Sequence, residues 1–333
     1  MRKTVAAFAA AALLVVAGCS ADGESAGTSP GSGADGPPPL EEKESYTIGF
    51  AGQQADHPWT LAFNESIESE VEARGHRFVY TDAQGSTARQ VENIESLIAQ
   101  QVDVIIVTPR EERPLAEAVL KAKDAGIPVF VADRAVDDEV AVAGEDYVAY
   151  IGSDFFEEGR MAGAWVEEYL EGSGTVIELA GTTGSSAADD RGGGFREAIE
   201  GTDIEIVASQ DGDMIRDKGR QNMETLIQQY PDVDVVFAHN DEMGLGAITA
   251  LEAAGYSPGE DVAVISIDGQ KEALQAIIDG KLNASVECNP RFGPAVLDAI
   301  EAYGRGESVD PVVMNEDKFF DASNAAAEID NAF

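Results

Sequence analysis

The sequence predicts an α/β fold in which two similar doubly wound parallel-sheet lobes follow one another along the chain. The first observation is a repeat. A helical stretch over residues 90–100 runs into the apolar segment 102–107, and residues 221–229 run into 233–237 in the same way. The second is that apolar runs alternate with amphipathic stretches throughout, which is typical of parallel sheets covered by helices on both faces.

The first lobe is expected to contain four strands and three helices. The strands are short apolar runs bounded by polar or turn residues: 47–50, 78–80, 104–107 and 129–133. Phe63, Ile67 and Val71 recur at four-residue spacing before Gly75, which predicts a helix that ends there. Two further helices, each with one apolar face, are expected over 87–101 and 115–125.

The second lobe repeats this alternation. Its predicted strands are residues 175–179, 204–207, 233–237 and 262–267. Its predicted helices lie near residues 194–200, 218–230 and 244–254. A chain of 333 residues has room for two such domains, since domains contain about 150 residues.

The charge balance excludes one class of ligand. There are 62 acidic residues and 22 basic ones, which gives a formal net charge of −40. Nucleic acids and polyphosphates bind where Lys and Arg neutralise their charge, so neither is expected as a partner. We interpret the charge as a solvated acidic surface. Adaptation to a saline habitat, where salt screens the self-repulsion, is a further hypothesis.

The N-terminus has the composition of an export signal. Arg2 and Lys3 precede an apolar run over residues 5–17, which is too short to span a bilayer. The Val-Ala-Gly-Cys sequence that ends at Cys19 resembles a bacterial lipobox. We therefore expect residues 1–19 to be a lipoprotein signal peptide, with Cys19 lipidated at the outer face of the cytoplasmic membrane. Residues 20–45 are rich in Gly, Ser, Pro and acid, which predicts a disordered tether.

Polar residues gather at the ends of the predicted strands, where ligands bind in open parallel sheets. They are Asp133, Arg134, Asn240, Asp241 and Asp268, with Arg191 after a Gly-rich loop and Trp59 in the loop after the first strand. Carboxylates accept hydrogen bonds from hydroxyls, Arg donates several, and Trp offers a flat apolar face. The set suits a small neutral polyol, although strand-end Asp residues also cap helices and a lone Trp often lies in a core.

Catalytic motifs are missing from the sequence. There is no phosphate-binding loop with a Gly-Lys-Ser/Thr ending and no Gly-x-Ser-x-Gly nucleophile turn. Residues 181–184 follow a strand and open a helix but lack dinucleotide-binding spacing. The histidines His57, His76 and His239 do not have metal-ligand spacing, and residues 211–217 miss the calcium-loop pattern. We expect no enzyme activity, no cofactor and no metal. Cys288 is expected to be a buried apolar residue, with a ligand contact as the alternative.

Four segments, residues 176–191, 237–243, 266–269 and 283–287, resemble the periplasmic ribose/galactose-type sugar-binding proteins, and most of all their galactofuranose-binding branch. The resemblance covers about residues 46–320. It implies a type I substrate-binding protein whose lobes are joined by three crossover segments and close by a hinge. The implied N-terminal lobe comprises residues 46–152 and 289–312, and the C-terminal lobe comprises 153–288 and 313–333.

The resemblance also implies the residues that bind the sugar. They are Asp56, Trp59, Asp133, Arg134, Arg191, Met214, Asn240, Asp268 and Glu287. Met214 stands where relatives often carry Phe, and Glu287 stands near a position that is often Gln in ribose binders, so both argue against ribose. Galactofuranose, arabinofuranose and related aldoses remain candidates. Replacing Asp133 or Arg191 by Ala is expected to abolish binding without unfolding the protein.

The implied partners are the monosaccharide, an ABC permease with its ATPase, and the membrane through the lipid on Cys19. The protein is expected to act as a monomer. Two alternatives keep a sugar ligand: a receptor that signals to a membrane sensor, and a nucleotide-dependent sugar enzyme. A sugar-responsive transcriptional regulator shares this kind of fold but requires a basic helix-turn-helix at the N-terminus, where this chain has an apolar signal.

Overall fold

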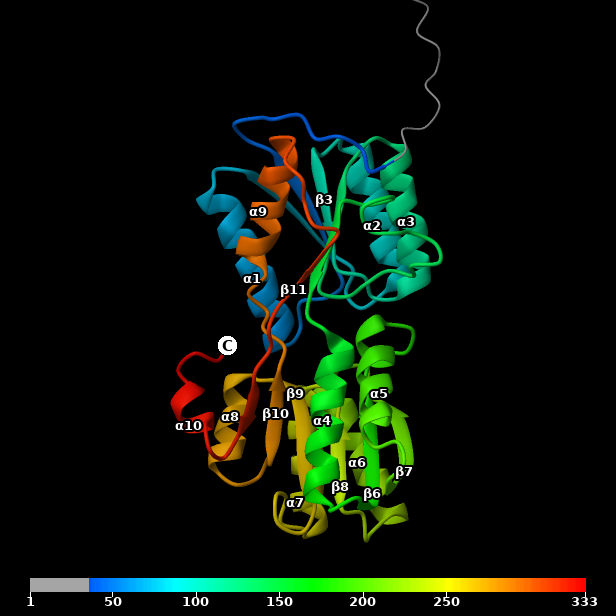
Figure 1. Ribbon diagram of the computed structural model, residues 1–333, viewed down its shortest axis with the longest axis vertical. Helices are drawn as coiled ribbons and strands as arrows, with labels where there is room; N and C mark the ends of the chain where they lie inside the picture. Colours follow the sequence, from blue (N-terminus) through cyan, green and yellow to red (C-terminus); the bar gives the residue numbers. More distant parts are fainter. Residues whose placement is uncertain (1–35) are drawn as a thin grey trace, which may run out of the picture. The chain divides into compact units, whose positions relative to one another are not determined.

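The computed structural model describes residues 36–333 (Figure 1). The predicted signal peptide, the lipidation site Cys19 and residues 20–35 of the predicted tether lie outside the described residues. The last ten residues of that tether, 36–45, lie against the first lobe. The hydroxyl of Tyr303 donates to the backbone oxygen of Pro38 at 2.9 Å, and Leu40 packs on the hydrophobic core, so this stretch belongs with the folded part.

The first lobe is a six-stranded parallel sheet with helices on both faces. Its strand order is β11-β5-β4-β3-β1-β2. The strands are β1 (Thr47–Gly52), β2 (Arg77–Asp82), β3 (Val104–Val107), β4 (Val129–Ala132), β5 (Ala149–Gly152) and β11 (Val312–Met314). The helices are α1 (Pro58–Ala73), α2 (Thr87–Ala99), α3 (Glu112–Asp124) and α9 (Gly293–Gly304). Helices α1 and α9 cover one face, and α2 and α3 cover the other (Figure 1).

The second lobe has the same strand order, β12-β10-β9-β8-β6-β7, with only β12 antiparallel to its neighbour. Its strands are β6 (Ser173–Ala180), β7 (Asp203–Asp211), β8 (Val235–Ala238), β9 (Ala263–Asp268), β10 (Ala284–Glu287) and β12 (Phe319–Asp321). Its helices are α4 (Phe155–Tyr169), α5 (Ser186–Ala198), α6 (Arg216–Gln229), α7 (Asp241–Ala254), α8 (Lys271–Ile278) and α10 (Ala325–Glu328). Since each sheet is doubly wound, the predicted fold class is confirmed.

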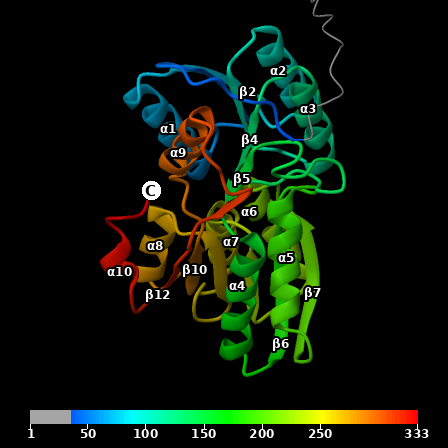
Figure 2. The same ribbon diagram turned by 45° about the horizontal axis from the view of Figure 1, so that its top comes forward.

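The chain crosses between the sheets three times, after β5, after β10 and after β11 (Figures 1 and 2). The first two crossings lie next to the expected lobe boundaries at 152 and 288. The third comes after β11, because Val312–Met314 pairs with β5 in the first sheet. The first lobe therefore extends two residues beyond the expected boundary at 312. This strand is a short, partly exposed edge without the apolar run that marks the other strands.

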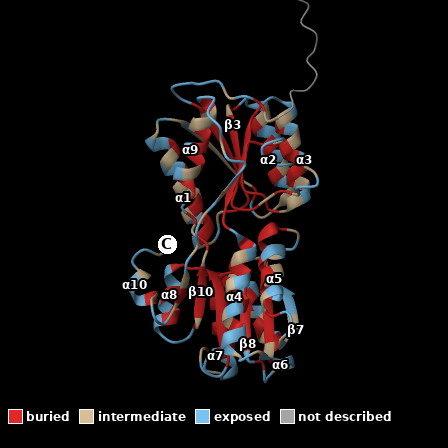
Figure 3. Cartoon of the chain, in the orientation of Figure 1, coloured by how far each residue is buried: buried red, intermediate tan, exposed pale blue. Residues whose placement is uncertain are grey.

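The central strands could be predicted from the sequence because they are buried along their whole length. Every residue of β3, β4, β8 and β9 is buried, as strands covered on both faces must be (Figure 3). The sequence patterns did not predict helices α4, α8 and α9. Between residues 36 and 333, no helix combines the length and the apolar composition that crossing a bilayer requires.

Helix α5 begins earlier than expected, at Ser186 rather than near Gly194. The run Gly192, Gly193 and Gly194 resembles a helix break in the sequence, yet it lies inside the helix. Close packing on α4 requires it, because a Cβ at Gly194 would lie 1.9 Å from the backbone oxygen of Phe156. Gly159 on α4 approaches α5 in the same way, and its Cβ would lie 2.1 Å from the backbone oxygen of Arg191. The glycines thus bring α4 and α5 into close contact near Arg191.

Two adjacent glycines test this packing. Gly194→Ala should lower the free energy of unfolding by about 1–3 kcal/mol, because the new methyl group overlaps the backbone of α4. Gly193→Ala is the matched control, since its Cβ would lie 3.4 Å from the Phe156 ring, an ordinary contact. It should be neutral or stabilise by up to about 1 kcal/mol, the helix-propensity difference between Gly and Ala. Urea denaturation measures both, and equal effects would contradict the proposed role of Gly194.

Candidate functional site

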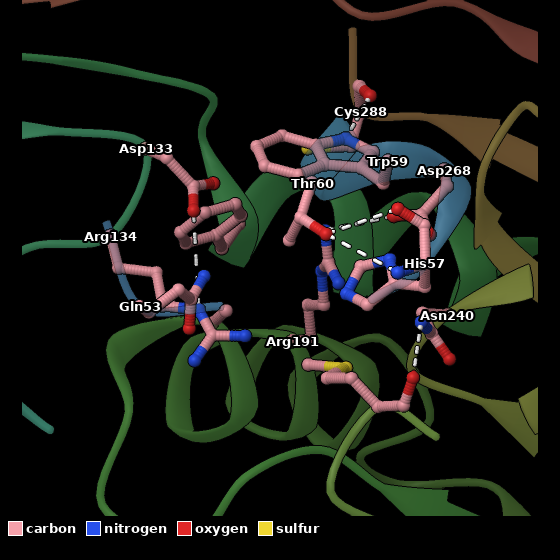
Figure 4. A pocket seen from close by; sticks show the side chains of 13 residues that line it. Gln53, His57, Trp59, Thr60, Asp133, Arg134, Arg191, Asn240, Asp268 and Cys288 are labelled. Carbon is pink, nitrogen blue, oxygen red and sulfur yellow. Dashed lines mark hydrogen bonds and ion pairs between the residues drawn. The ribbon is translucent and has the colours of Figure 1, made fainter. Parts of the chain in front are cut away.

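A small cavity lies between the lobes, where the carboxyl ends of strands from both sheets face each other. The space among its lining residues is about 310 Å³, and part of it is open to solvent. Seven of the nine residues predicted to bind a ligand line it: Trp59, Asp133, Arg134, Arg191, Met214, Asn240 and Asp268. Asp133 and Arg134 lie on one side and Asp268 and Asn240 on the other, with Trp59 between them (Figure 4).

The first lobe contributes a charged pair and an aromatic face. Asp133 and Arg134 follow β4 directly, and the hydroxyl of Tyr150 donates to the backbone oxygen of Asp133 at 2.6 Å. Trp59 lies in the first turn of α1 rather than in the preceding loop. Its indole Nε1 donates to the backbone oxygen of Cys288 at 2.8 Å, and its ring stacks on Phe63 with centroids 5.3 Å apart. These contacts fix the indole plane at the cavity wall.

The second lobe contributes residues from four of its elements. Asn240 caps α7: its Oδ1 accepts from the backbone N–H of Met243 at 3.0 Å, and its Nδ2 donates to the backbone oxygen of Met214 at 3.2 Å. Asp268 ends β9, and Arg191 lies in the middle of α5, not at its start as expected. The hydrogen bond from Nδ2 therefore ties Asn240 to the loop that presents Met214.

Backbone strain is concentrated at this cavity. Among residues 36–333, seven non-glycine residues have a positive φ, and three of them line the cavity: Asp133 at 66°, Met214 at 61° and Asp268 at 135°. Each such residue costs about 1–3 kcal/mol and persists only where the surrounding structure holds it. Strain of this kind clusters at ligand sites, where the side-chain direction it produces is needed.

The charged groups in the cavity are buried but lack hydrogen bonds. Asp133, Arg134 and Asp268 are each 5% exposed or less, and none of their side chains has a hydrogen-bond partner within the described residues. The shortest approaches are 4.0 Å between Arg134 Nε and Asp133 Oδ2, and 3.8 Å between Arg191 Nη2 and Asp268 Oδ1. Burial raises the pKa of Asp133 to about 6 and lowers that of Arg134 to about 10. It also raises the pKa of Asp268 well above its usual value.

Arg191, in contrast, is anchored by the protein. Its Nε donates to Glu158 Oε2 at 2.7 Å, and its Nη1 donates to the backbone oxygen of His239 at 2.6 Å. The guanidinium also lies 4.9 Å from the centroid of the Phe155 ring. Burial lowers the pKa of Arg191, but the carboxylates of Glu158 and Asp268 outweigh burial and raise it. Because its partner Glu158 is 1% exposed, we expect replacement of Arg191 to affect folding as well as binding, unlike the expectation drawn from the sequence.

Two predicted ligand residues lie outside the cavity lining. Asp56 is exposed, and the side chain of Glu287 turns to the crossover segment, where it accepts from the backbone N–H of Lys318 at 3.1 Å. The prediction for both rested on their position in the sequence. A residue next to a ligand position can point away from it, and only the backbone direction decides which way.

The cavity also contains residues that the sequence analysis did not propose as ligands: Gln53, His57, Thr60, Phe155, Ala187 and Cys288. The Oε1 of Gln53 and the Nδ1 of His57 are buried without a hydrogen-bond partner, as is the Nη1 of Arg134. Pro58, a helix-start signal directly after His57, could have drawn attention to that position. Within residues 36–333, no group of three or more His, Cys, Asp or Glu residues is arranged to hold a metal ion.

Comparison with known proteins shows a consistent relationship. The periplasmic binding protein domain family matches residues 48–308. The galactofuranose-binding protein YtfQ of Escherichia coli (strain K12) is 37% identical over 262 residues, which cover 77% of this chain and 81% of that protein. A solved Mycobacterium smegmatis protein in complex with β-D-fucofuranose is 42% identical, with a TM-score of 0.82 and coverage of 86% and 94% of the two chains.

A second similar solved structure is that of a transporter component. The periplasmic binding protein of the arabinose ABC transporter from Shewanella sp. ANA-3, bound to α- and β-L-arabinofuranose, is 36% identical to this chain. Its TM-score is 0.80, and the match covers 86% of this chain and 95% of the other.

The two arginines of the cavity should differ in their effect on stability. Arg191→Met leaves the buried Glu158 carboxylate without its partner, so we expect the free energy of unfolding to fall by about 3 kcal/mol or more. Arg134→Met breaks no hydrogen bond within the described residues and removes only a 4.0 Å approach to Asp133, so the loss should be smaller than in Arg191→Met. Urea denaturation of the ligand-free protein measures both. A loss in Arg134→Met as large as in Arg191→Met would contradict this division of roles.

Proposed function

This chain belongs to the periplasmic binding protein family, and we propose that it is an extracytoplasmic receptor that binds a neutral monosaccharide in its furanose form. The receptor closes its two lobes around the sugar and delivers it to the permease and ATPase of an ABC importer. It acts as a monomer, and the lipid on Cys19 holds it at the outer face of the membrane.

The buried charges of the cavity that lack hydrogen bonds are the observation that carries this proposal. A buried charge without hydrogen bonds costs several kcal/mol, so Asp133, Arg134 and Asp268 need a polar partner that the protein does not supply. Sugar hydroxyls meet that need, because each can donate to a carboxylate and accept from a guanidinium. A hydrogen bond to a charged group contributes about 1.5–3 kcal/mol, and micromolar affinity requires about −8 kcal/mol. A few such bonds with Trp59 packing are sufficient.

The balance of charge argues for a neutral ligand. The carboxylates of Asp133 and Asp268 line the cavity with the guanidinium groups of Arg134 and Arg191, and Glu158 lies outside the lining, paired with Arg191. An anionic sugar would add a charge to a site where one arginine is already paired with Glu158. Sugar acids and sugar phosphates are therefore disfavoured, and aldoses are preferred.

The furanose form and the transport role are supported by the relatives. Three proteins with at least 36% identity are named for galactofuranose, fucofuranose and arabinofuranose. The arabinofuranose-bound relative is a component of an ABC transporter. The small cavity also favours a compact ring with one face against an aromatic wall, which Trp59 supplies here.

Calorimetric titration of the purified protein with galactose, arabinose, fucose, ribose and furanose-locked glycosides tests the proposal. We expect one-to-one binding with micromolar or stronger affinity for at least one furanose. Asp133→Asn should weaken it at least about tenfold, the effect of losing about 1.4 kcal/mol. Glu287→Gln is the control: it lies near the cavity without lining it and should bind like the wild type. Absence of heat with every sugar would contradict the proposed function.

Binding should weaken in acid. The pKa of Asp133 is about 6 in the ligand-free closed cavity, and sugar hydroxyls donate to its ionised form. Sugar therefore binds the ionised protein more tightly, and affinity should fall as the pH drops below about 6, by up to about tenfold per pH unit for one proton. Asp268, whose pKa is also raised by burial, acts in the same direction. Titrations between pH 5 and 8 measure this, and Asp133→Asn should show a shallower dependence.

A further inference from the structure

A buried carboxylate outside the cavity joins two strand ends that line it. Asp241, the first residue of α7, is fully buried and directly follows Asn240. Its Oδ1 accepts from the hydroxyls of Ser266 at 2.5 Å and Ser285 at 2.8 Å. Its Oδ2 accepts from the backbone N–H of Gln270 at 2.7 Å. The sequence places Asp241 among the strand-end polar residues, but it does not line the cavity.

The turn after β9 is strained. Asp268 has a φ of 135° and Gly269 a φ of 74°, so two consecutive residues occupy the left-handed half of conformational space. Residues with a Cβ rarely adopt such φ angles, so contacts with the surrounding structure must stabilise the turn. The N–H groups of the two residues after Asp268 both donate hydrogen bonds. Gly269 donates to Ser285 Oγ at 3.1 Å, and Gln270 donates to Asp241 Oδ2.

The direction of these hydrogen bonds is set by the chemistry of the groups. An ionised carboxylate only accepts, so the Ser285 hydroxyl donates to Asp241 and keeps a lone pair for the N–H of Gly269. Ser266 donates to the same oxygen but accepts no hydrogen bond from an N–H group of the turn. Of the two buried serines on Asp241, only Ser285 therefore connects it to the strained backbone.

We propose that Asp241 and Ser285 are positioning residues that hold the turn at Asp268 and thereby aim its carboxylate into the cavity. The effect of this pair on sugar affinity rests on the proposed function, whereas its effect on the turn does not depend on any ligand. Asp241 directly follows Asn240 after β8 and accepts from the turn after β9, so the pair connects the ends of these two strands.

Ser285→Ala and Ser266→Ala form a matched pair. Both serines are fully buried, and each replacement removes one hydroxyl that donates to Asp241 Oδ1. The first readout is amide hydrogen exchange of the ligand-free protein over residues 266–272, at pH 8. This pH keeps Asp241 ionised, since burial raises its pKa to about 7. Ser285→Ala should speed exchange at Gly269 and Gln270 at least tenfold more than Ser266→Ala does. Equal exchange in the two variants would overturn the proposal.

The second readout is affinity for the furanose that binds the wild type in the titrations above, with L-arabinose as the first probe. Ser285→Ala should weaken binding at least tenfold and Ser266→Ala less than threefold. In an Asp268→Asn background, Ser285→Ala should cause no further loss, because its effect passes through the Asp268 carboxylate. An additive loss would instead show that Ser285 acts only on general stability, and would overturn the proposal.

Asp241→Asn is a second variant that preserves shape. Its amide can donate to the serines and accept from Gln270, but Ser285 then receives two donors and its own proton loses its acceptor. We expect exchange and affinity between those of Ser285→Ala and the wild type. If wild-type protein binds none of the sugars, the proposed function fails, while the exchange measurement still decides the role of this pair.

Discussion

Burial of opposite charges between the lobes governs much of this structure. A charge moved from water into a protein interior must find hydrogen bonds and a counter-charge there. Arg191 finds both in Glu158 and the backbone oxygen of His239. Asp133, Arg134 and Asp268 do not, although they are equally buried. The guanidinium of Arg191 is therefore held by the protein itself, whereas the charged groups of Asp133, Arg134 and Asp268 have no hydrogen bond within the described residues.

The two sheets present a carboxylate at equivalent strand ends. Asp133 follows β4 and Asp268 ends β9, and these strands hold the same position in the two strand orders. Both residues have a positive φ. The repeat thus delivers one carboxylate from each lobe to opposite sides of the cavity. The next residue along the chain differs, because it is Arg134 in the first lobe and Gly269 in the second, so the two sides of the cavity are chemically unlike.

Direct contacts between the lobes accompany the cavity. Arg110 Nη2 donates to Asp213 Oδ1 at 2.7 Å, and the backbone N–H of Ala135 donates to Ser186 Oγ at 2.9 Å. Asp213 also holds Lys218 and Thr182 of its own lobe, and it precedes Met214, which lines the cavity. One strained loop consequently serves both the contact between the lobes and the wall of the site.

The amino-acid sequence alone was enough to predict the alternation of strands and helices, the two similar lobes and most of the strand-end residues at the cavity. Strands buried on both faces are continuous apolar runs, and parallel strands present their carboxyl ends on one side, so Asp133, Asn240 and Asp268 could be placed by that rule. The folded arrangement was needed to show that Gly194 lies inside a helix, that Arg191 pairs with Glu158, and that Asp56 and Glu287 turn away. These features depend on which atoms of distant segments meet in space, and no local pattern of residues specifies such a meeting.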